Sequence, residues 1–393
     1  MRGTRLFAPE TAACPGAKLR PVSLVNDARL VARGLSAAIR PPDAPWKLTC
    51  AVTWRCEQRC THCRIWRRER SPELTAGDWR RVFASVGEGL SWLDLTGGEV
   101  TSRDDFEALA RGAVEVCPHL AMLHFPTNGQ HPDAVLRVAR GLLGGASRDA
   151  HGGSSAASRR GRRRGPRLVV SVSLDGPRET HDRLRGDPGA FDAAVETFRR
   201  LRELGVETYF GMTLSDYTVT LVEETRQALA DAFPGFQWTD LHVNLLQLSP
   251  HYFQNPMLGR KLGREAAAVA VAELVRRRGL PRHPTHLLEW LYQRNVAAHV
   301  RTGRSPVPCA SASVNAFIDP EGLVYPCHIW DRPLARLPEH DLDLRAVWRL
   351  PVVAEVRREI AAERCPGCWT PCEAYPTVLA HLGSAALGAL RQP

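Results

Sequence analysis

The sequence predicts an α/β fold built around a parallel sheet. From Lys47 onward, short apolar runs alternate with amphipathic segments of helical length. Strands that alternate with helices pair in parallel, joined by right-handed crossovers. Several of these runs are followed at once by polar, glycine-containing or cysteine-containing segments. In parallel sheets the chemistry lies at the carboxyl ends of the strands, so we expect the functional residues there.

The strands and helices can be assigned in chain order. Thr75 is a natural N-cap for the first helix, with Asp78 three residues later, and Gly205 is a natural helix stop. The predicted strands cover residues 48–54, 93–95, 121–125, 168–174, 206–213 and 241–248. The predicted helices cover residues 75–90, 104–116, 132–143, 190–204 and 221–233.

The net charge of +10 comes largely from one segment. Six arginines fall between Arg159 and Arg167, and without them the balance is ordinary, so a nucleic-acid partner is not expected. We interpret 144–166 as a disordered basic insertion, either a solvated loop or a docking site for an acidic partner. No apolar run has the length of a signal peptide or a membrane span, which predicts a cytoplasmic protein without a membrane partner.

Three cysteines follow the first predicted strand directly. Cys56, Cys60 and Cys63 have the spacing C-x3-C-x2-C, in a chain of eleven cysteines with no visible export signal. Clustered cysteines in a reducing compartment indicate metal ligation. A cubane iron–sulfur cluster needs four ligands, so three thiolates leave one iron open to a small molecule. A small zinc site or a loop of reduced cysteines is the alternative.

This spacing, directly after the first strand, resembles the radical SAM enzymes. The resemblance implies a partial (β/α)6 barrel in which the three cysteines hold a 4Fe-4S cluster. In that family the open iron is chelated by the amino and carboxylate groups of S-adenosylmethionine. Reduction then breaks the cofactor into methionine and a deoxyadenosyl radical, which abstracts a hydrogen atom from the substrate. One difference is His62, which stands where the family usually has an aromatic residue.

A glycine–glutamate motif follows the second predicted strand. Gly97 and Gly98 let the backbone approach a ligand closely, and Glu99 is an acceptor suited to a cationic amine. The motif resembles the GGE sequence of the family, which implies contact with the amino group of the methionine part. Taken alone, a glycine turn with a helix-capping carboxylate explains it equally.

Two further segments of the same resemblance follow the third and fourth strands. Asn128 precedes a glycine, which indicates first a turn and second a place near the cofactor. Ser173 and Asp175 lie in a Ser-Leu-Asp-Gly segment that the resemblance places near the ribose of the cofactor. His181 and Arg185, one helical turn apart, form either a local polar cluster or part of the active site.

A second cysteine group lies near the C-terminus. A turn at residues 319–322 predicts a hairpin that brings two of these cysteines together. The group resembles the extension called SPASM or twitch in this family, which implies one auxiliary 4Fe-4S cluster; a zinc site is the alternative. The first-choice ligands are Cys309, Cys327, Cys365 and Cys368, while Cys372 either replaces one of them or is free.

His328 directly follows one of these cysteines, and a histidine is a residue type suited to act as a catalytic proton acceptor. The predicted segments are an N-terminal lead-in (1–46), a radical SAM partial barrel (47–255), a helical connector (256–304) and an auxiliary-cluster domain (305–393).

The sequence therefore predicts an enzyme that cleaves S-adenosylmethionine and modifies either a peptide or protein side chain or a small natural product. A reductant such as flavodoxin or ferredoxin is the implied partner. Whether the net reaction is an oxidation, an epimerisation or an elimination stays open. The alternative from another class is a non-catalytic iron–sulfur electron carrier or sensor.

Overall fold

The computed structural model describes residues 24–40, 42–148, 165–258, 264–281 and 284–391. Its centre is a nine-stranded sheet in the order β6-β5-β4-β3-β2-β1-β7-β8-β9. The strands are β1 (Lys47–Thr53), β2 (Trp92–Gly97), β3 (Met122–Thr127), β4 (Arg167–Ser173), β5 (Glu207–Leu214), β6 (Leu241–Leu245), β7 (Asn315–Ile318), β8 (Leu323–Tyr325) and β9 (Ala335–Arg336).

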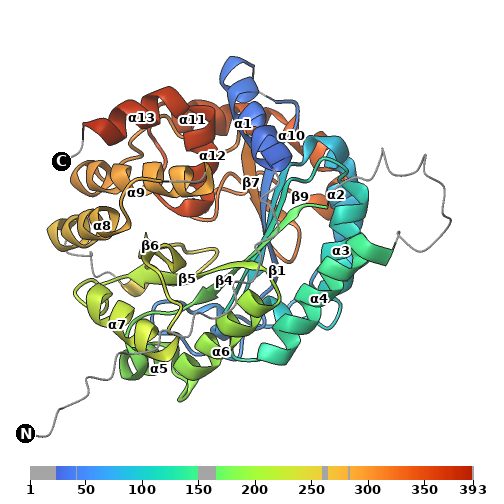
Figure 1. Cartoon of the computed structure of the whole chain (residues 1–393). Helices are drawn as coiled ribbons and strands as arrows, with labels where there is room; N and C mark the ends of the chain where they lie inside the picture. Colours follow the sequence, from blue (N-terminus) through green and yellow to red (C-terminus); the bar gives the residue numbers. More distant parts are fainter. Residues whose placement is uncertain (1–23, 41, 149–164, 259–263, 282–283, 392–393) are drawn as a thin grey trace, which may run out of the picture.

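Strands β1 to β6 are parallel and follow one another in chain order. The sheet curves without closing, and a row of helices covers its outer face (Figure 1). These helices are α2 (Ala76–Val86), α3 (Phe106–Val116), α4 (Pro132–Arg148), α6 (Ala190–Glu203) and α7 (Val222–Ala232), and the short helix α5 (Arg178–Arg185) follows β4. The predicted α/β partial barrel is confirmed.

Local sequence signals explain where helix α2 begins and ends. The Thr75 hydroxyl accepts the Asp78 N–H at 3.1 Å, and the Asp78 carboxylate accepts the Thr75 N–H at 3.0 Å, which is a capping box. The helix ends at Val86, earlier than predicted, because Gly87 adopts a positive φ of 54°. Helix α4 extends to Arg148, into the range of the predicted insertion, and residues 149–164 lie outside the described residues.

The C-terminal strands continue the same sheet. Strand β7 pairs in parallel with β1, and β8 pairs with β7 in antiparallel fashion, which confirms the predicted hairpin. Gly322 has a φ of +84° in the turn, and Asp319 Oδ1 accepts the N–H groups of Glu321 and Leu323 at 3.0 and 2.9 Å. The hairpin therefore lies directly beside the strand that leads into the first cysteine group.

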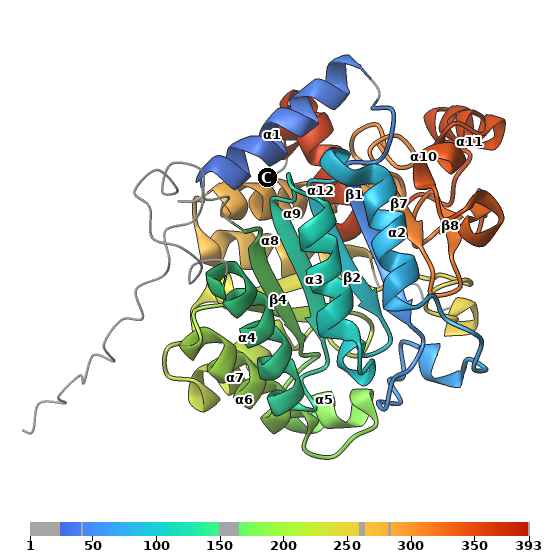
Figure 2. The same ribbon diagram turned by 90° about the vertical axis from the view of Figure 1, so that its right-hand side faces the viewer.

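The remaining helices, apart from α1, belong to the C-terminal part of the chain (Figure 2). Helix α1 packs on α12 so closely that a Cβ at Gly34 would lie 2.4 Å from the carbonyl oxygen of Leu379. No helix in the described ranges is long and apolar enough to cross a membrane. These helices are α1 (Leu24–Ile39), α8 (Arg264–Arg278), α9 (Pro284–Thr302), α10 (Leu344–Trp348), α11 (Pro351–Ala361), α12 (Pro371–Ala380) and α13 (Leu382–Leu390).

Candidate active site

The loop with the first three cysteines begins at the carboxyl end of β1 and is tied to its surroundings through its main chain. Helix α5 accepts two of its N–H groups, and the segment after β6 holds its far end. The bonds are Arg59 N–H to Arg185 O (3.1 Å), Thr61 N–H to Leu184 O (2.9 Å), Arg64 N–H to Phe253 O (2.8 Å) and Asn255 Nδ2 to His62 O (3.0 Å). The loop conformation is thus fixed from two sides.

Of the three thiols of this loop, Cys60 is a neighbour of both Cys56 and Cys63. Cys60 is buried, whereas Cys56 and Cys63 are half-buried, and all three are free thiols. Burial, and to a smaller extent the neighbouring Cys60, raises the pKa of Cys63 to about 12. The guanidinium of Arg185 lies 3.8 Å from Cys60 Sγ and favours its thiolate. This set of sulfurs fits an iron–sulfur cluster, whose ligands are thiolates.

Asp175 holds Arg185 in this position. Its Oδ2 lies 2.6 Å from Arg185 Nη2, and its Oδ1 accepts the Thr213 N–H at 2.7 Å. Burial alone would raise the pKa of Asp175, but Arg185, His62, His181 and the Thr213 N–H together outweigh it and the pKa is lowered. His181 Nδ1 accepts the Asp175 N–H at 2.9 Å, so His181 and Arg185 form a local polar cluster that reaches the cysteine loop. Ser173 ends β4 and is half-buried.

Gly97 and Gly98 are explained by a close approach between two loops. A Cβ at Gly97 would lie 2.2 Å from Thr53 O, and one at Gly98 would lie 2.1 Å from Arg55 O. Gly97 also has a φ of +135°. The glycines therefore let the loop after β2 pack directly against the start of the cysteine loop, and this backbone contact is a reason for them that the sequence did not reveal.

The same approach positions Glu99. Its side chain is buried, and its Oε1 accepts the hydroxyls of Thr101 at 2.7 Å and Thr127 at 3.0 Å. Its Oε2 accepts the Asn128 N–H at 2.7 Å. Burial raises the pKa of Glu99 despite these bonds. An oxygen with one hydrogen bond can accept another, so Oε2 fits the amino group of a ligand.

Asn128 connects this carboxylate to the cysteine loop. Its Nδ2 donates to Glu57 Oε1 at 3.0 Å, and Glu57 is the residue after Cys56. Its Oδ1 accepts the Gln130 N–H at 2.9 Å, as the predicted turn requires. Sequence reasoning missed Glu57, which no motif marked.

Four of the five C-terminal cysteines lie together. Burial raises the pKa of the Cys368 thiol, and the nearby charges of Cys327, Cys309 and Cys365 raise it further. Cys327 Sγ also accepts the Trp330 N–H at 3.3 Å. Four thiols in one place match the ligand number of an iron–sulfur cluster or a structural zinc.

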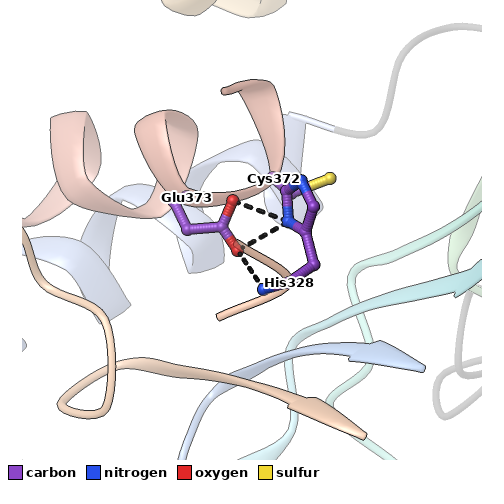
Figure 3. Close-up of side chains that lie close together, drawn as sticks. All are labelled: His328, Cys372 and Glu373. Atoms are coloured by element: carbon purple, nitrogen blue, oxygen red, sulfur yellow. Dashed lines mark hydrogen bonds and ion pairs between the residues drawn. The ribbon is translucent and has the colours of Figure 1, made fainter. Parts of the chain in front are cut away.

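Cys372 has different neighbours (Figure 3). Its thiol lies within 4.8 Å of the ligand atoms of His328 and Glu373, and its carbonyl accepts Lys47 Nζ at 2.9 Å. Burial raises its pKa while Lys47 lowers it, and the other main influences are Glu373 and Asp94. Cys372 therefore lies near Lys47 of β1 and Asp94 of β2, and Cys372 and Cys368 both raise the pKa of the Tyr292 hydroxyl.

His328 is buried and paired. Its Nδ1 lies 2.9 Å from Glu373 Oε2, and the rings of Tyr252 and Phe253 meet its ring edge-on at 5.7 and 5.8 Å. Tyr252 also bonds the Thr96 hydroxyl at 2.9 Å, beside the glycine–glutamate loop. His328 thus lies between the two cysteine groups, with a carboxylate that orients its ring. The sequence contained no signal for its pairing with Glu373.

A chain of buried and half-buried polar side chains crosses the inner face of the sheet. Lys47 Nζ lies 2.8 Å from Asp94 Oδ2, Asp94 Oδ1 lies 3.2 Å from His124 Nδ1, and His124 Nε2 lies 3.0 Å from Ser171 Oγ. Each of the four neighbouring strands β1 to β4 contributes one of these residues.

Comparison with known proteins gives relatives for most of the chain. The mycofactocin maturase MftC of Mycobacterium ulcerans is 25% identical over 350 residues, which cover 83% of this chain and 80% of the relative. The Fe-coproporphyrin III synthase of Methanosarcina barkeri is 28% identical, but the match spans only 37% of its length. The sporulation killing factor maturation protein SkfB of Bacillus subtilis is 23% identical over 40% of its length. No family model matches the chain.

Solved structures share the fold. Native anSMEcpe with bound AdoMet superposes with a TM-score of 0.57 at 14% identity, covering 88% of this chain and all of that one. SuiB of Streptococcus suis bound to S-adenosylmethionine gives a TM-score of 0.53 at 15% identity, covering 80% and 68%. The chain is thus similar in sequence to these maturases and synthases, and in fold to structures that bind S-adenosylmethionine. The predicted class of enzyme with a SPASM-type extension is confirmed, and the predicted 4Fe-4S clusters and S-adenosylmethionine are the cofactors of that class.

Proposed function

We propose that Cys56, Cys60 and Cys63 hold a 4Fe-4S cluster at which S-adenosylmethionine is reductively cleaved. When bound, the cluster supplies the electron that breaks the carbon–sulfur bond and yields a deoxyadenosyl radical. The observation that carries the proposal is the position of three thiols in a loop fixed between β1 and α5, beside the buried carboxylate of Glu99. The cluster and S-adenosylmethionine must bind beside each other, so their binding site requires this proximity.

The chain's own residues supply position and charge. Glu99 accepts the amino group of the methionine part at the loop that Gly97 and Gly98 bring against β1, and the Asn128 N–H orients the Glu99 carboxylate. Arg185 offsets the negative charge of the Cys60 thiolate, and Asp175 keeps Arg185 in place. Under this proposal, Asp175 and Ser173 at the end of β4 lie near the ribose of the cofactor. Asp175 acts there through the polar cluster that it forms with His181 and Arg185.

The auxiliary 4Fe-4S cluster is assigned to Cys309, Cys327, Cys365 and Cys368. The proximity of the other three to Cys368 supports the assignment, because each of them contributes to the raised pKa of Cys368. Cys372 remains outside this set.

The proposed substrate is a side chain of a peptide or protein. The relatives that support it are the maturases named above, and the structures include SuiB bound to its precursor peptide SuiA and anSMEcpe with a bound Cp18Cys peptide. His328, oriented by Glu373, is the proposed proton acceptor for the oxidised substrate. A small natural product is the second candidate. A non-catalytic electron carrier is not favoured, since it has no need of Glu99.

The experiment is anaerobic incubation of the reconstituted protein with S-adenosylmethionine, reductant and any short peptide encoded beside its gene. Deoxyadenosine formation together with a defined mass change in one peptide is the expected result. Deoxyadenosine without any peptide change, but with turnover of a small molecule, would replace the peptide by the second candidate. A reductant such as flavodoxin and a cytoplasmic location belong to the same proposal.

A further inference from the structure

Exposed arginines surround the first cysteine loop. Arg55, Arg59, Arg67, Arg70 and Arg183 are all exposed, and three of them flank the loop in sequence. The segment lies at the outer edge of the molecule, where the blue chain leaves β1 in Figure 2. A partner that approaches this edge therefore meets a field of positive charge.

An aromatic ring lies between two of these arginines. The guanidinium carbon of Arg59 is 5.9 Å from the centroid of the Trp66 ring, and that of Arg67 is 4.7 Å away. Trp66 Nε1 donates to the carbonyl oxygen of Cys63 at 3.1 Å. The half-exposed indole thus connects the surface to the main chain of a cysteine that we assign to the cluster.

Arg55 pairs with Glu73 at 3.7 Å, but the two arginines beside the indole are left without carboxylate partners among the described residues. Elsewhere exposed arginines form ion pairs, such as Arg199 with Glu196 at 2.8 Å and Arg276 with Glu273 at 2.6 Å. Within the described part of the chain, neither Arg59 nor Arg67 has a carboxylate within 4.0 Å. Unpaired exposed arginines beside an aromatic ring are typical of a binding surface.

We propose that Arg59, Trp66 and Arg67 form the docking surface for an acidic one-electron carrier protein, of the flavin or iron–sulfur class. The inference rests on the proposed function, which requires an electron at the cysteine loop. The carrier is oxidised by one electron, and that electron enters the carbon–sulfur bond of S-adenosylmethionine, which breaks into methionine and the deoxyadenosyl radical. Opposite charge accelerates the encounter, and the indole brings the carrier close to Cys63.

The test compares wild type with Arg59→Glu/Arg67→Glu. Binding of oxidised flavodoxin and of oxidised ferredoxin is measured by calorimetry at low and high salt. Deoxyadenosine formation is measured with the reduced carrier and, separately, with dithionite. We expect the double variant to bind the carrier about tenfold more weakly, with a shallower salt dependence, and to lose carrier-driven turnover in proportion. Dithionite-driven turnover should stay at the wild-type level.

Two further variants keep the test decisive. Arg276→Glu/Arg277→Glu on α8 carries the same charge change and should bind the carrier as wild type does. Arg59→Gln/Arg67→Gln removes the charges without adding acid, and should show a weaker form of the same defect if the reversal variant misfolds. An equal loss of carrier affinity in the α8 variant, or no loss of carrier affinity in either loop variant, would overturn the proposal.

The remaining outcomes separate this inference from its foundation. If the wild type binds neither carrier, the docking surface is wrong even when dithionite supports turnover. If dithionite yields no deoxyadenosine in the wild type, the proposed function itself fails. If the loop variants lose affinity for an acidic precursor peptide and keep affinity for the carrier, the surface belongs to the peptide and the inference is contradicted.

Discussion

The first cysteine group lies within eight consecutive residues. The cysteines of the second group come from segments that a hairpin and two helices separate in the sequence. The loop from Cys56 to Cys63 is fixed by main-chain hydrogen bonds to α5 and to the segment after β6. The second group joins Cys309 before β7, Cys327 after β8 and the pair Cys365 and Cys368 before α12. The first site is therefore set by local sequence, and the second by the packing of the whole C-terminal region.

The largest expected effect separates the two groups. Cys368→Ala should lower the iron content of reconstituted protein from about eight to about four per chain, because a four-iron cluster loses one of its ligands. Cys372→Ala is the matched control and should retain about eight irons, since Cys372 faces Lys47 and His328. Equal iron loss in both variants would return Cys372 to the ligand set. Iron and sulfide analysis makes the measurement.

The next effect concerns the support of the first group. Arg185→Gln should destabilise the protein by about 3–5 kcal/mol, because it leaves the buried Asp175 carboxylate without its ion pair. Arg183→Gln, exposed on the same helix, should change stability by less than about 0.5 kcal/mol. Urea unfolding under anaerobic conditions measures both. Similar values for the two variants would show that the ion pair does not fix the loop.

A smaller effect tests the contact between the loops after β1 and β2. Gly98→Ala should cost about 1–3 kcal/mol and weaken S-adenosylmethionine binding, because the added Cβ collides with Arg55 O. Gly77→Ala in α2 should be neutral or slightly stabilising, since its Cβ would have an ordinary contact at 3.5 Å. Thermal midpoints and cofactor binding by calorimetry check the pair. Unchanged binding in Gly98→Ala would separate this loop from the cofactor.

The smallest effect concerns the hairpin of the second group. Burial raises the pKa of Asp319 to about 6, above its ordinary value of 3.8. A raised folded-state pKa gives stability that is fully present below pH 4 and is lost as the pH rises through 6. The wild type should therefore lose on the order of 1–2 kcal/mol relative to Asp319→Asn between pH 4 and pH 6. If the free energies of unfolding of wild type and Asp319→Asn changed in parallel between pH 4 and pH 6, this assignment would be contradicted.

Sequence reasoning predicted what depends on nearby residues. The six parallel strands and the Thr75 cap follow from local periodicity and from turn residues, and the structure places them within a few positions of the prediction. The cysteine spacing after the first strand was equally visible, because the eight residues that form the loop are contiguous.

Long-range contacts could not be predicted in the same way. Nothing in the residues near Asn315 indicates that β7 adds to the edge of β1 in parallel. Lys47 looks like a polar flank of a strand, yet it is fully buried because Asp94 on the neighbouring strand neutralises it. The position of Cys372 beside His328 and Lys47 likewise depends on how α12 faces the sheet.

The most direct test of the account compares wild type with Cys56→Ala/Cys60→Ala/Cys63→Ala after anaerobic reconstitution. We expect about eight irons and deoxyadenosine formation in the wild type, against about four irons and no deoxyadenosine in the variant. That result would assign one cluster and the cleavage of S-adenosylmethionine to the loop after β1. Deoxyadenosine formation by the variant, or zinc in place of iron in the wild type, would contradict the central claim.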